Sequence, residues 1–207
     1  MKRYEKNMQT RRKIIDSAIL EFGEKSYGEA SVNTICSTGN ISKGIIYHYF
    51  KDKDELYLNC VRECFDALTD YLGTVVTVDG LSAEGAMEGY FDARIAFFEA
   101  HPSYLGIFCG AVTNPPVHLS AAVDEITAGF NAQTVWIMTA LLGKVKLRPD
   151  VTLEEVIEVF REYQDFVNVR IQMRTSGKST LEEHEKRCRR SLQILLYGVI
   201  EREVPKL

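Results

Sequence analysis

The sequence lacks any apolar run long enough to cross a lipid bilayer. Its longest apolar stretches, VWIMTALLG and ILLYGVI, are much shorter than the roughly 20 residues that a membrane-spanning helix needs. The basic opening MKRYEKNMQTRRK is not followed by the apolar stretch that a secretory signal peptide requires. We therefore expect a soluble cytoplasmic protein with no membrane partner.

The sequence also lacks the short motifs of common enzyme classes. It contains no H-E-x-x-H, no G-x-S-x-G, no Walker loop and no dinucleotide-binding glycine motif. No arrangement of its serines and histidines identifies a catalytic triad. We therefore expect no catalytic residues and no cofactor. An enzyme stays open as an alternative class, and so does a helical adaptor that uses its aromatic residues to contact other proteins.

Cysteine is sparse and forms no C-x-x-C pair. The five cysteines lie at positions 36, 60, 64, 109 and 188, and an odd count in an intracellular chain favours reduced thiols. Cys60 and Cys64 are four residues apart and would share a helix face, either as packing residues or as a metal or oxidant-sensing site. His184 and Cys188 have the same spacing within a charged stretch. We expect packing for the first pair, a solvated helix face for the second, and no metal site.

Negative charge dominates the chain but not its beginning. The net charge is −4, which by itself argues against binding to nucleic acid. Residues 1–53, however, carry 10 Lys and Arg against 6 Asp and Glu, whereas residues 54–207 carry 15 against 23. A basic end on an acidic body is typical of a protein with one surface for a polyanion. A chance fluctuation is the alternative.

Hydrophobic periodicity is helical along the whole chain, and no alternating strand pattern persists. We expect an all-α fold of about nine helices. The first helix carries an apolar face made of Ile14, Ile15, Ala18, Ile19 and Phe22. A capping-box spacing predicts that a long helix starts near residue 53. The helices expected after it cover residues 83–100, 103–112, 118–146, 153–175 and 181–201.

Two short helices joined by a tight turn are expected between residues 31 and 50. Ser31 is a suitable N-cap for the first helix and Ser42 for the second, with Asn40 favouring a left-handed turn between them. Ile41 and Ile46 would face the core. This pattern is typical of a helix-turn-helix unit. Its outward residues would be Lys43, Gly44, Ile45, Tyr47 and His48.

The outward residues have the chemistry that recognition of duplex DNA needs. Lys43 can donate to guanine and Ile45 can pack on a thymine methyl group, while Gly44 lets the backbone come close. Tyr47 and His48 would reach phosphates. Lys53 would bind another phosphate at the start of the next helix. The alternative is a helical corner with exposed polar residues, because such corners also occur in proteins that never bind DNA.

The stretches TRRKIIDSAILEFGEKSY and SVNTICSTGNISKGIIYHYFKDKDEL, together with the chain length, resemble the TetR family of bacterial transcription regulators. The resemblance implies a DNA-binding domain over residues 1–53 and a helical effector-binding and dimerisation domain over residues 54–207. It also implies a set of DNA-binding residues. They are Thr10, Arg11, Asn33, Ser42, Lys43, Gly44, Ile45, Tyr47, His48 and Lys53.

The sequence departs from the family pattern at several places. The turn reads Gly39-Asn40-Ile41 where the family usually has Ala-Gly-Val, and Cys36 stands where alanine is usual. Ile45 replaces a common threonine, which changes the expected base preference. Asn33 is neutral where some relatives carry arginine. None of these changes conflicts with the fold.

The rest of the chain is expected to dimerise and to bind an effector. One helix-turn-helix buries too little surface for tight binding, so a homodimer would read the two halves of a palindromic operator. The homodimer interface would be formed by apolar stripes on the last two helices, made of Val156, Phe160, Val167, Ile171, Leu192, Leu195, Leu196 and Val199. The alternative is that these stripes only complete the core of the monomer. Because most members of the family repress, the resemblance implies a repressor that a small-molecule effector releases from the operator; an activator is the alternative. The expected effector-binding residues are Arg94, Phe98, Tyr104, Phe108, Trp136 and Tyr163.

Overall fold

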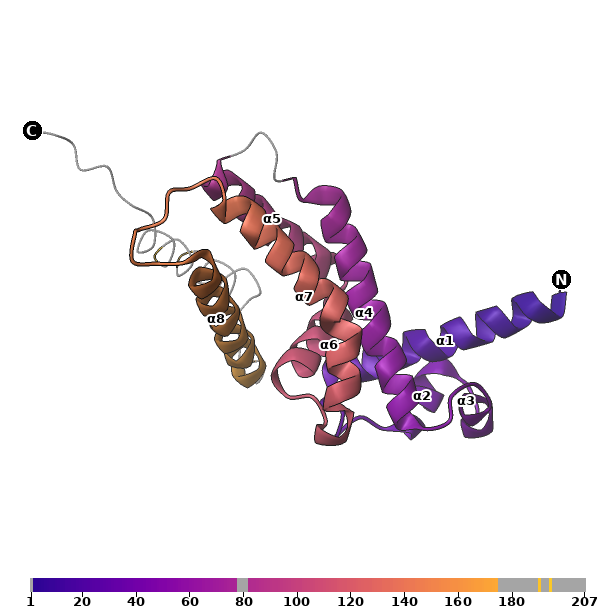
Figure 1. Ribbon diagram of the computed structural model, residues 1–207. Coiled ribbons are helices and arrows are strands. Elements are labelled where there is room, and N and C mark those ends of the chain that lie inside the picture. Colours follow the sequence, from indigo (N-terminus) through magenta and orange to yellow (C-terminus); the bar gives the residue numbers. More distant parts are fainter. Residues whose placement is uncertain (1, 78–81, 175–189, 191–193, 195–207) are drawn as a thin grey trace, which may run out of the picture. The chain divides into compact units, whose positions relative to one another are not determined.

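The structure is a computed structural model that describes residues 2–77, 82–174, 190 and 194 of the 207-residue chain. These residues form eight α-helices and one 3-10 helix, with no β-strand among them, which confirms the all-α class. Figure 1 labels the α-helices. The elements are α1 (Lys2–Glu24), α2 (Val32–Gly39), α3 (Lys43–Tyr49), α4 (Lys53–Val75), α5 (Ala83–Ala100), α6 (Pro102–Thr113), η1 (Val117–Leu119), α7 (Ser120–Leu142) and α8 (Leu153–Arg174).

The expected helix boundaries differ from the structure in two places. α1 begins at Lys2, about three turns before Ile14, where the apolar periodicity starts. The helix expected over residues 118–146 is α7, which follows η1 and ends at Leu142. It ends there because Lys144 and Val145 donate to carbonyl oxygens only three residues back, which tightens the last turn. Apart from residues 190 and 194, the helix expected over residues 181–201 lies outside the described residues, and so do the expected dimer residues Leu192, Leu195, Leu196 and Val199.

The contacts divide the chain into two compact units. The first contains Met1–Ala67 and Phe98–Ala128, and the second contains Leu68–Phe97 and Gly129–Leu207. They are groups of packed residues and do not test the functional boundary expected at residue 53, which stays a prediction.

The core of the first unit is built around the apolar face of α1. All five residues of that face are buried, as the periodicity predicted. α1 and α6 then pack backbone against backbone at Gly23 and Gly106. A Cβ atom added to Gly106 would lie 1.9 Å from the Gly23 carbonyl oxygen, and one added to Gly23 would lie 2.4 Å from the Ser103 carbonyl oxygen. Only glycine therefore permits this crossing.

In the second unit, side chains join α7 to α4 and to α5. Gln133 on α7 donates from Nε2 to the Thr69 carbonyl oxygen on α4 (3.0 Å). The fully buried Tyr90 on α5 shares a hydrogen bond with Thr134 on α7 (3.4 Å). These bonds give partners to the Gln133 amide nitrogen and to the Tyr90 and Thr134 hydroxyl groups inside an otherwise apolar interior.

No single helix in the described part of the chain is both long and apolar enough to cross a membrane, although α5 and α6 together pass the same test as a bent pair. The described residues also contain no group of three or more His, Cys, Asp or Glu side chains suited to a metal ion.

Candidate nucleic-acid interface

The turn between α2 and α3 is fixed by backbone geometry and by caps at both helices. The Ser31 side chain accepts from the backbone N–H of Asn33 (3.2 Å), and the Ser42 side chain accepts from that of Ile45 (3.4 Å). Asn40 is in the left-handed region with φ 46° and ψ 53°, which asparagine tolerates better than most residues. Both caps and the turn residue were predicted from the sequence. They set the direction in which α3 leaves the turn.

The buried carboxylate of Glu21 supports the first of these caps. It accepts from the backbone N–H of Ser31 (2.9 Å) and from the Lys25 ammonium group (2.9 Å). Burial alone would raise the pKa of Glu21, but the hydrogen bonds from Lys25 and Ser31 outweigh it, and the pKa lies below its ordinary value. The ionised carboxylate therefore stabilises the fold.

Replacing Glu21 by glutamine is expected to lower the free energy of unfolding by about 1–2 kcal/mol at pH 7. A carboxyl group with a depressed pKa stabilises the folded state above its unfolded pKa of about 4.3, and this stabilisation is lost as pH falls through the lower folded value. The difference from wild type should therefore shrink at pH 3. Urea unfolding at both pH values measures it, with Glu24→Gln on the exposed face of the same helix as control. A difference that persists at pH 3 would contradict the role of the charge.

α3 presents the predicted residues to the outside. Ile46 and Phe50 are 1% exposed and anchor the helix, whereas Ile45 and Tyr47 are 42% and 44% exposed. Lys43, Gly44 and His48 are exposed too. Nothing lies within 4 Å of a Cβ atom added to Gly44, so packing inside the protein does not require glycine there. The structure confirms the outward orientation, and the DNA contacts remain predictions.

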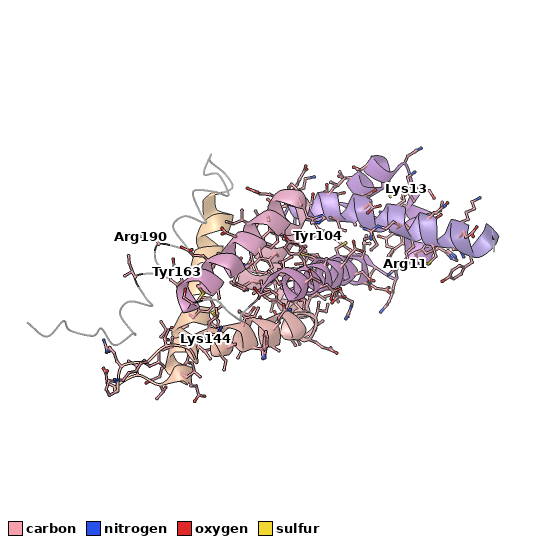
Figure 2. The ribbon with its side chains drawn as sticks, turned by 90° about the horizontal axis from the view of Figure 1, so that it is seen from above. Arg11, Lys13, Tyr104, Lys144, Tyr163 and Arg190 are labelled. Carbon is pink, nitrogen blue, oxygen red and sulfur yellow. The ribbon has the colours of Figure 1, made fainter. Side chains whose placement is uncertain are left out.

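The expected DNA-binding residues of α1 are engaged within the protein. The Thr10 hydroxyl group donates to the Lys6 carbonyl oxygen (2.9 Å). Arg11, labelled in Figure 2, donates to Asn59 Oδ1 (2.7 Å), and its guanidinium carbon lies 5.3 Å from the centre of the Phe50 ring. Arg11 therefore links α1 both to α4 and to Phe50, the residue that follows α3. A DNA contact by either residue stays a prediction, as it does for the exposed Asn33.

Lys53 lies in a cluster that sequence reasoning missed. Its Nζ donates to the Tyr27 carbonyl oxygen (2.5 Å) and lies 4.4 Å from the centre of the Tyr27 ring. Partial burial lowers the pKa of Lys53. The Tyr27 hydroxyl group donates to Asp54, whose other carboxylate oxygen lies 3.1 Å from Nε2 of His118. His118 belongs to η1, and no local signal in the sequence connects it to α4.

A second network joins α1, α4 and α6. Two guanidinium nitrogens of Arg12 donate to the two Glu63 carboxylate oxygens, each at 2.7 Å. The Tyr104 hydroxyl group donates to the same carboxylate (2.8 Å). The hydrogen bond to Glu63, followed by that to Asp16, raises the pKa of Arg12. Tyr104 was expected in the effector site, and the structure shows that its hydroxyl group already has a partner on α4.

The six expected effector-binding residues fall into both units. Phe98 and Phe108 are buried in the first unit with ring centres 5.3 Å apart, and Tyr104 belongs to the same unit. The remaining three belong to the second unit: Arg94 lies 5.8 Å from the centre of the Tyr90 ring, Trp136 is 61% exposed, and Tyr163 is half-buried. Whether they bind an effector stays a prediction.

Comparisons with known proteins agree with this arrangement. Residues 14–60 match the family model described as "Bacterial regulatory proteins, tetR family". The biofilm operon icaADBC HTH-type negative transcriptional regulator IcaR of Staphylococcus epidermidis is 38% identical over 158 residues, which cover 76% of each chain. IcaR of Staphylococcus aureus is 27% identical over 112 residues, covering 54% of this chain and 58% of that protein.

Solved structures show the same fold at low sequence identity. FadR from Bacillus subtilis, in complex with stearoyl-CoA, has a TM-score of 0.71 and 16% identity, and the match covers 91% of this chain and 98% of that chain. FadR from Bacillus halodurans has a TM-score of 0.70, also at 16% identity. The chain therefore has the fold of helix-turn-helix transcriptional regulators. It belongs to the TetR family.

Proposed function

We propose that this protein is a cytoplasmic repressor that binds a palindromic operator as a homodimer and leaves it when a small-molecule effector binds. The observation that carries the proposal is the exposed face of α3, where Lys43, Ile45 and Tyr47 point outward from a helix anchored by Ile46 and Phe50. Lys43 can donate hydrogen bonds to base edges, Ile45 can pack on a thymine methyl group, and Tyr47 can reach a phosphate. Gly44, which has no side chain, lets the backbone come close to the DNA.

Repression is supported by the relatives, because IcaR of both staphylococcal species is named a negative regulator. A small-molecule effector is supported by the structure of FadR with stearoyl-CoA, a protein of similar fold. The homodimer is supported by the geometry of operator reading, since two recognition helices must reach half-sites about 34–36 Å apart. The difference between the effector's affinities for the DNA-binding and released conformations would set how far operator binding weakens.

Lys43 and Lys53 are expected to respond differently to replacement by alanine. Lys43→Ala should cost about 1–3 kcal/mol on the preferred operator and little on random duplex, because Lys43 reads bases. Lys53→Ala should weaken binding to both duplexes alike and reduce the salt slope by about one, because Lys53 binds a phosphate. Fluorescence anisotropy with both duplexes over a range of salt concentrations measures these effects.

Lys144→Ala is the matched control, because this exposed lysine lies after α7 and outside the helix-turn-helix. It should leave both duplex affinities unchanged. Equal losses on operator and random DNA for Lys43→Ala would contradict its base-reading role. Wild-type protein that shows no sequence preference and no salt dependence would favour the adaptor or enzyme alternative.

A further inference from the structure

Four side chains from three separate segments meet at the start of α4. We call them the α4 cluster: Tyr27 from the connection between α1 and α2, Lys53 and Asp54 from the first turn of α4, and His118 from η1. All four belong to the first compact unit. His118 lies outside residues 14–60, the part of the chain that matches the family model. The match to the family therefore assigns it no role.

Tyr27 determines where the Lys53 ammonium group lies. The ammonium group is held both by the Tyr27 carbonyl oxygen and over the face of the Tyr27 ring. Such a cation–π contact restricts a side chain that would otherwise sample many rotamers. The ring itself is fixed against Tyr57, with ring centres 5.1 Å apart in an edge-to-face arrangement, and against Phe22 at 6.4 Å. Movement of Tyr27 would therefore move the lysine.

Asp54 connects Tyr27 to His118 through its two carboxylate oxygens. Oδ1 accepts from the Tyr27 hydroxyl group, while Oδ2 faces Nε2 of His118 at 3.1 Å. The His118 ring also meets the edge of the Tyr27 ring, with centres 5.8 Å apart. The His118 and Asp54 side chains are 57% and 37% exposed, so solvent protons reach the pair. Without His118, one oxygen of the carboxylate would lose its protein partner beside a predicted phosphate site.

We propose that His118 is a positioning residue for the phosphate contact of Lys53, acting through Asp54 and Tyr27. His118 orients the Asp54 carboxylate, and this carboxylate accepts a hydrogen bond from the Tyr27 hydroxyl group. Tyr27 in turn positions the Lys53 ammonium group through its carbonyl oxygen and its ring. When protonated, His118 forms an ion pair with Asp54 and so holds this carboxylate, Tyr27 and Lys53 more firmly in place. This inference rests on the proposed function, because it concerns the same interface with duplex DNA phosphates.

A double-mutant cycle on the full-length protein tests this connection. His118→Ala should weaken operator binding about 3–10-fold, and Lys53→Ala should weaken it at least as much. The double variant should bind no more weakly than Lys53→Ala alone, because His118 acts through Lys53. His101→Ala is the matched control: this exposed histidine stacks on Tyr104 at the start of α6, away from the α4 cluster, and its loss should leave the affinity unchanged.

The pH dependence of operator binding gives a readout that a purely structural role would not change. Histidine side chains change charge between about pH 5 and 8. Protonation of His118 strengthens its contact with Asp54 and therefore the positioning of Lys53, so the wild-type affinity should rise as pH falls from 8 to 6. The other charged groups facing the pair are Lys53 beside Asp54 and Asp52 beside Tyr27. The ordinary pKa values of lysine and aspartate lie well outside this range.

His118→Gln should retain a donor for Asp54 and keep the fold, but the rise in affinity at low pH should become smaller. His48 on α3 is a second histidine at the proposed interface, so the difference between wild type and His118→Gln isolates the contribution of His118. If the His118→Ala and Lys53→Ala effects multiply, or if the pH response is the same in His118→Gln, the inference is overturned. Wild-type protein that does not distinguish operator from random duplex would instead overturn the proposed function.

Discussion

Gly106→Ala is expected to lower the free energy of unfolding by about 2–3 kcal/mol. A Cβ atom at this position would lie 1.9 Å from the Gly23 carbonyl oxygen and 2.8 Å from the Gly23 carbonyl carbon. Both atoms are backbone, so no side chain can rotate away, and α1 and α6 must separate. The crossing is the point where α6 packs on the helix that carries the core of the first unit. Urea unfolding followed by circular dichroism measures the change.

The same helix provides a matched control for this substitution. Gly110 lies one turn further along α6, and nothing lies within 4 Å of a Cβ atom added there. Gly110→Ala should therefore stabilise the protein by about 0.5–1 kcal/mol, because alanine restricts the unfolded chain and favours the helix. Both variants replace a glycine of α6 by alanine, but the expected changes in the free energy of unfolding have opposite signs. A Gly106→Ala protein as stable as Gly110→Ala would show that the helices do not cross as closely as described.

The helix-turn-helix could be predicted from the sequence because its signals are local. The caps Ser31 and Ser42, the left-handed Asn40 and the inward pair Ile41 and Ile46 all act within a few residues of their own position. A cap needs only the next backbone N–H groups, and an apolar face needs only the helical period. The outward face of α3 follows from these constraints without knowledge of the rest of the chain.

The contacts around Lys53 and Tyr104 could not be predicted, because they join residues far apart in the chain. Asp54 meets His118 across 64 positions, and Glu63 meets Tyr104 across 41. The spacing of residues around His118 and Tyr104 does not predict which distant residue each side chain contacts. The sequence showed that Tyr104 lies among aromatic residues, and an effector contact was therefore expected. Its hydrogen bond to Glu63 depends on how α6 packs on α4, which only the structure shows.

Cys60, Cys64 and Cys109 are expected to resist alkylation in the folded protein, whereas Cys36 should react. The first three are at most 3% exposed, and Cys36 is half-buried near the surface of α2. Burial in the apolar core raises the pKa of the Cys60 and Cys64 thiols, and the thiolate is the reactive form. Both access and ionisation therefore oppose the reaction.

The three buried thiols should react only through unfolding of the protein. For a domain with ordinary stability of about 5–15 kcal/mol, this protects them at least ~10³-fold. Iodoacetamide at pH 8 followed by peptide mass spectrometry gives the rate at each cysteine, and the same protein in urea gives the unprotected rates. Cys188 lies outside the described residues, so Cys188→Ser leaves Cys36 as the only reference thiol.

This experiment also decides between the two interpretations of the Cys60–Cys64 pair. An oxidant sensor or a metal ligand needs an accessible thiolate, whereas a packing residue needs neither access nor charge. The contact of Cys64 favours the packing role, because its thiol donates to the Tyr104 carbonyl oxygen (3.4 Å) and so joins α4 to α6. Oxidation of that sulfur would break this contact within the core. Rapid labelling of Cys60 or Cys64 in the folded protein would contradict the packing role and favour a reactive site beneath α6.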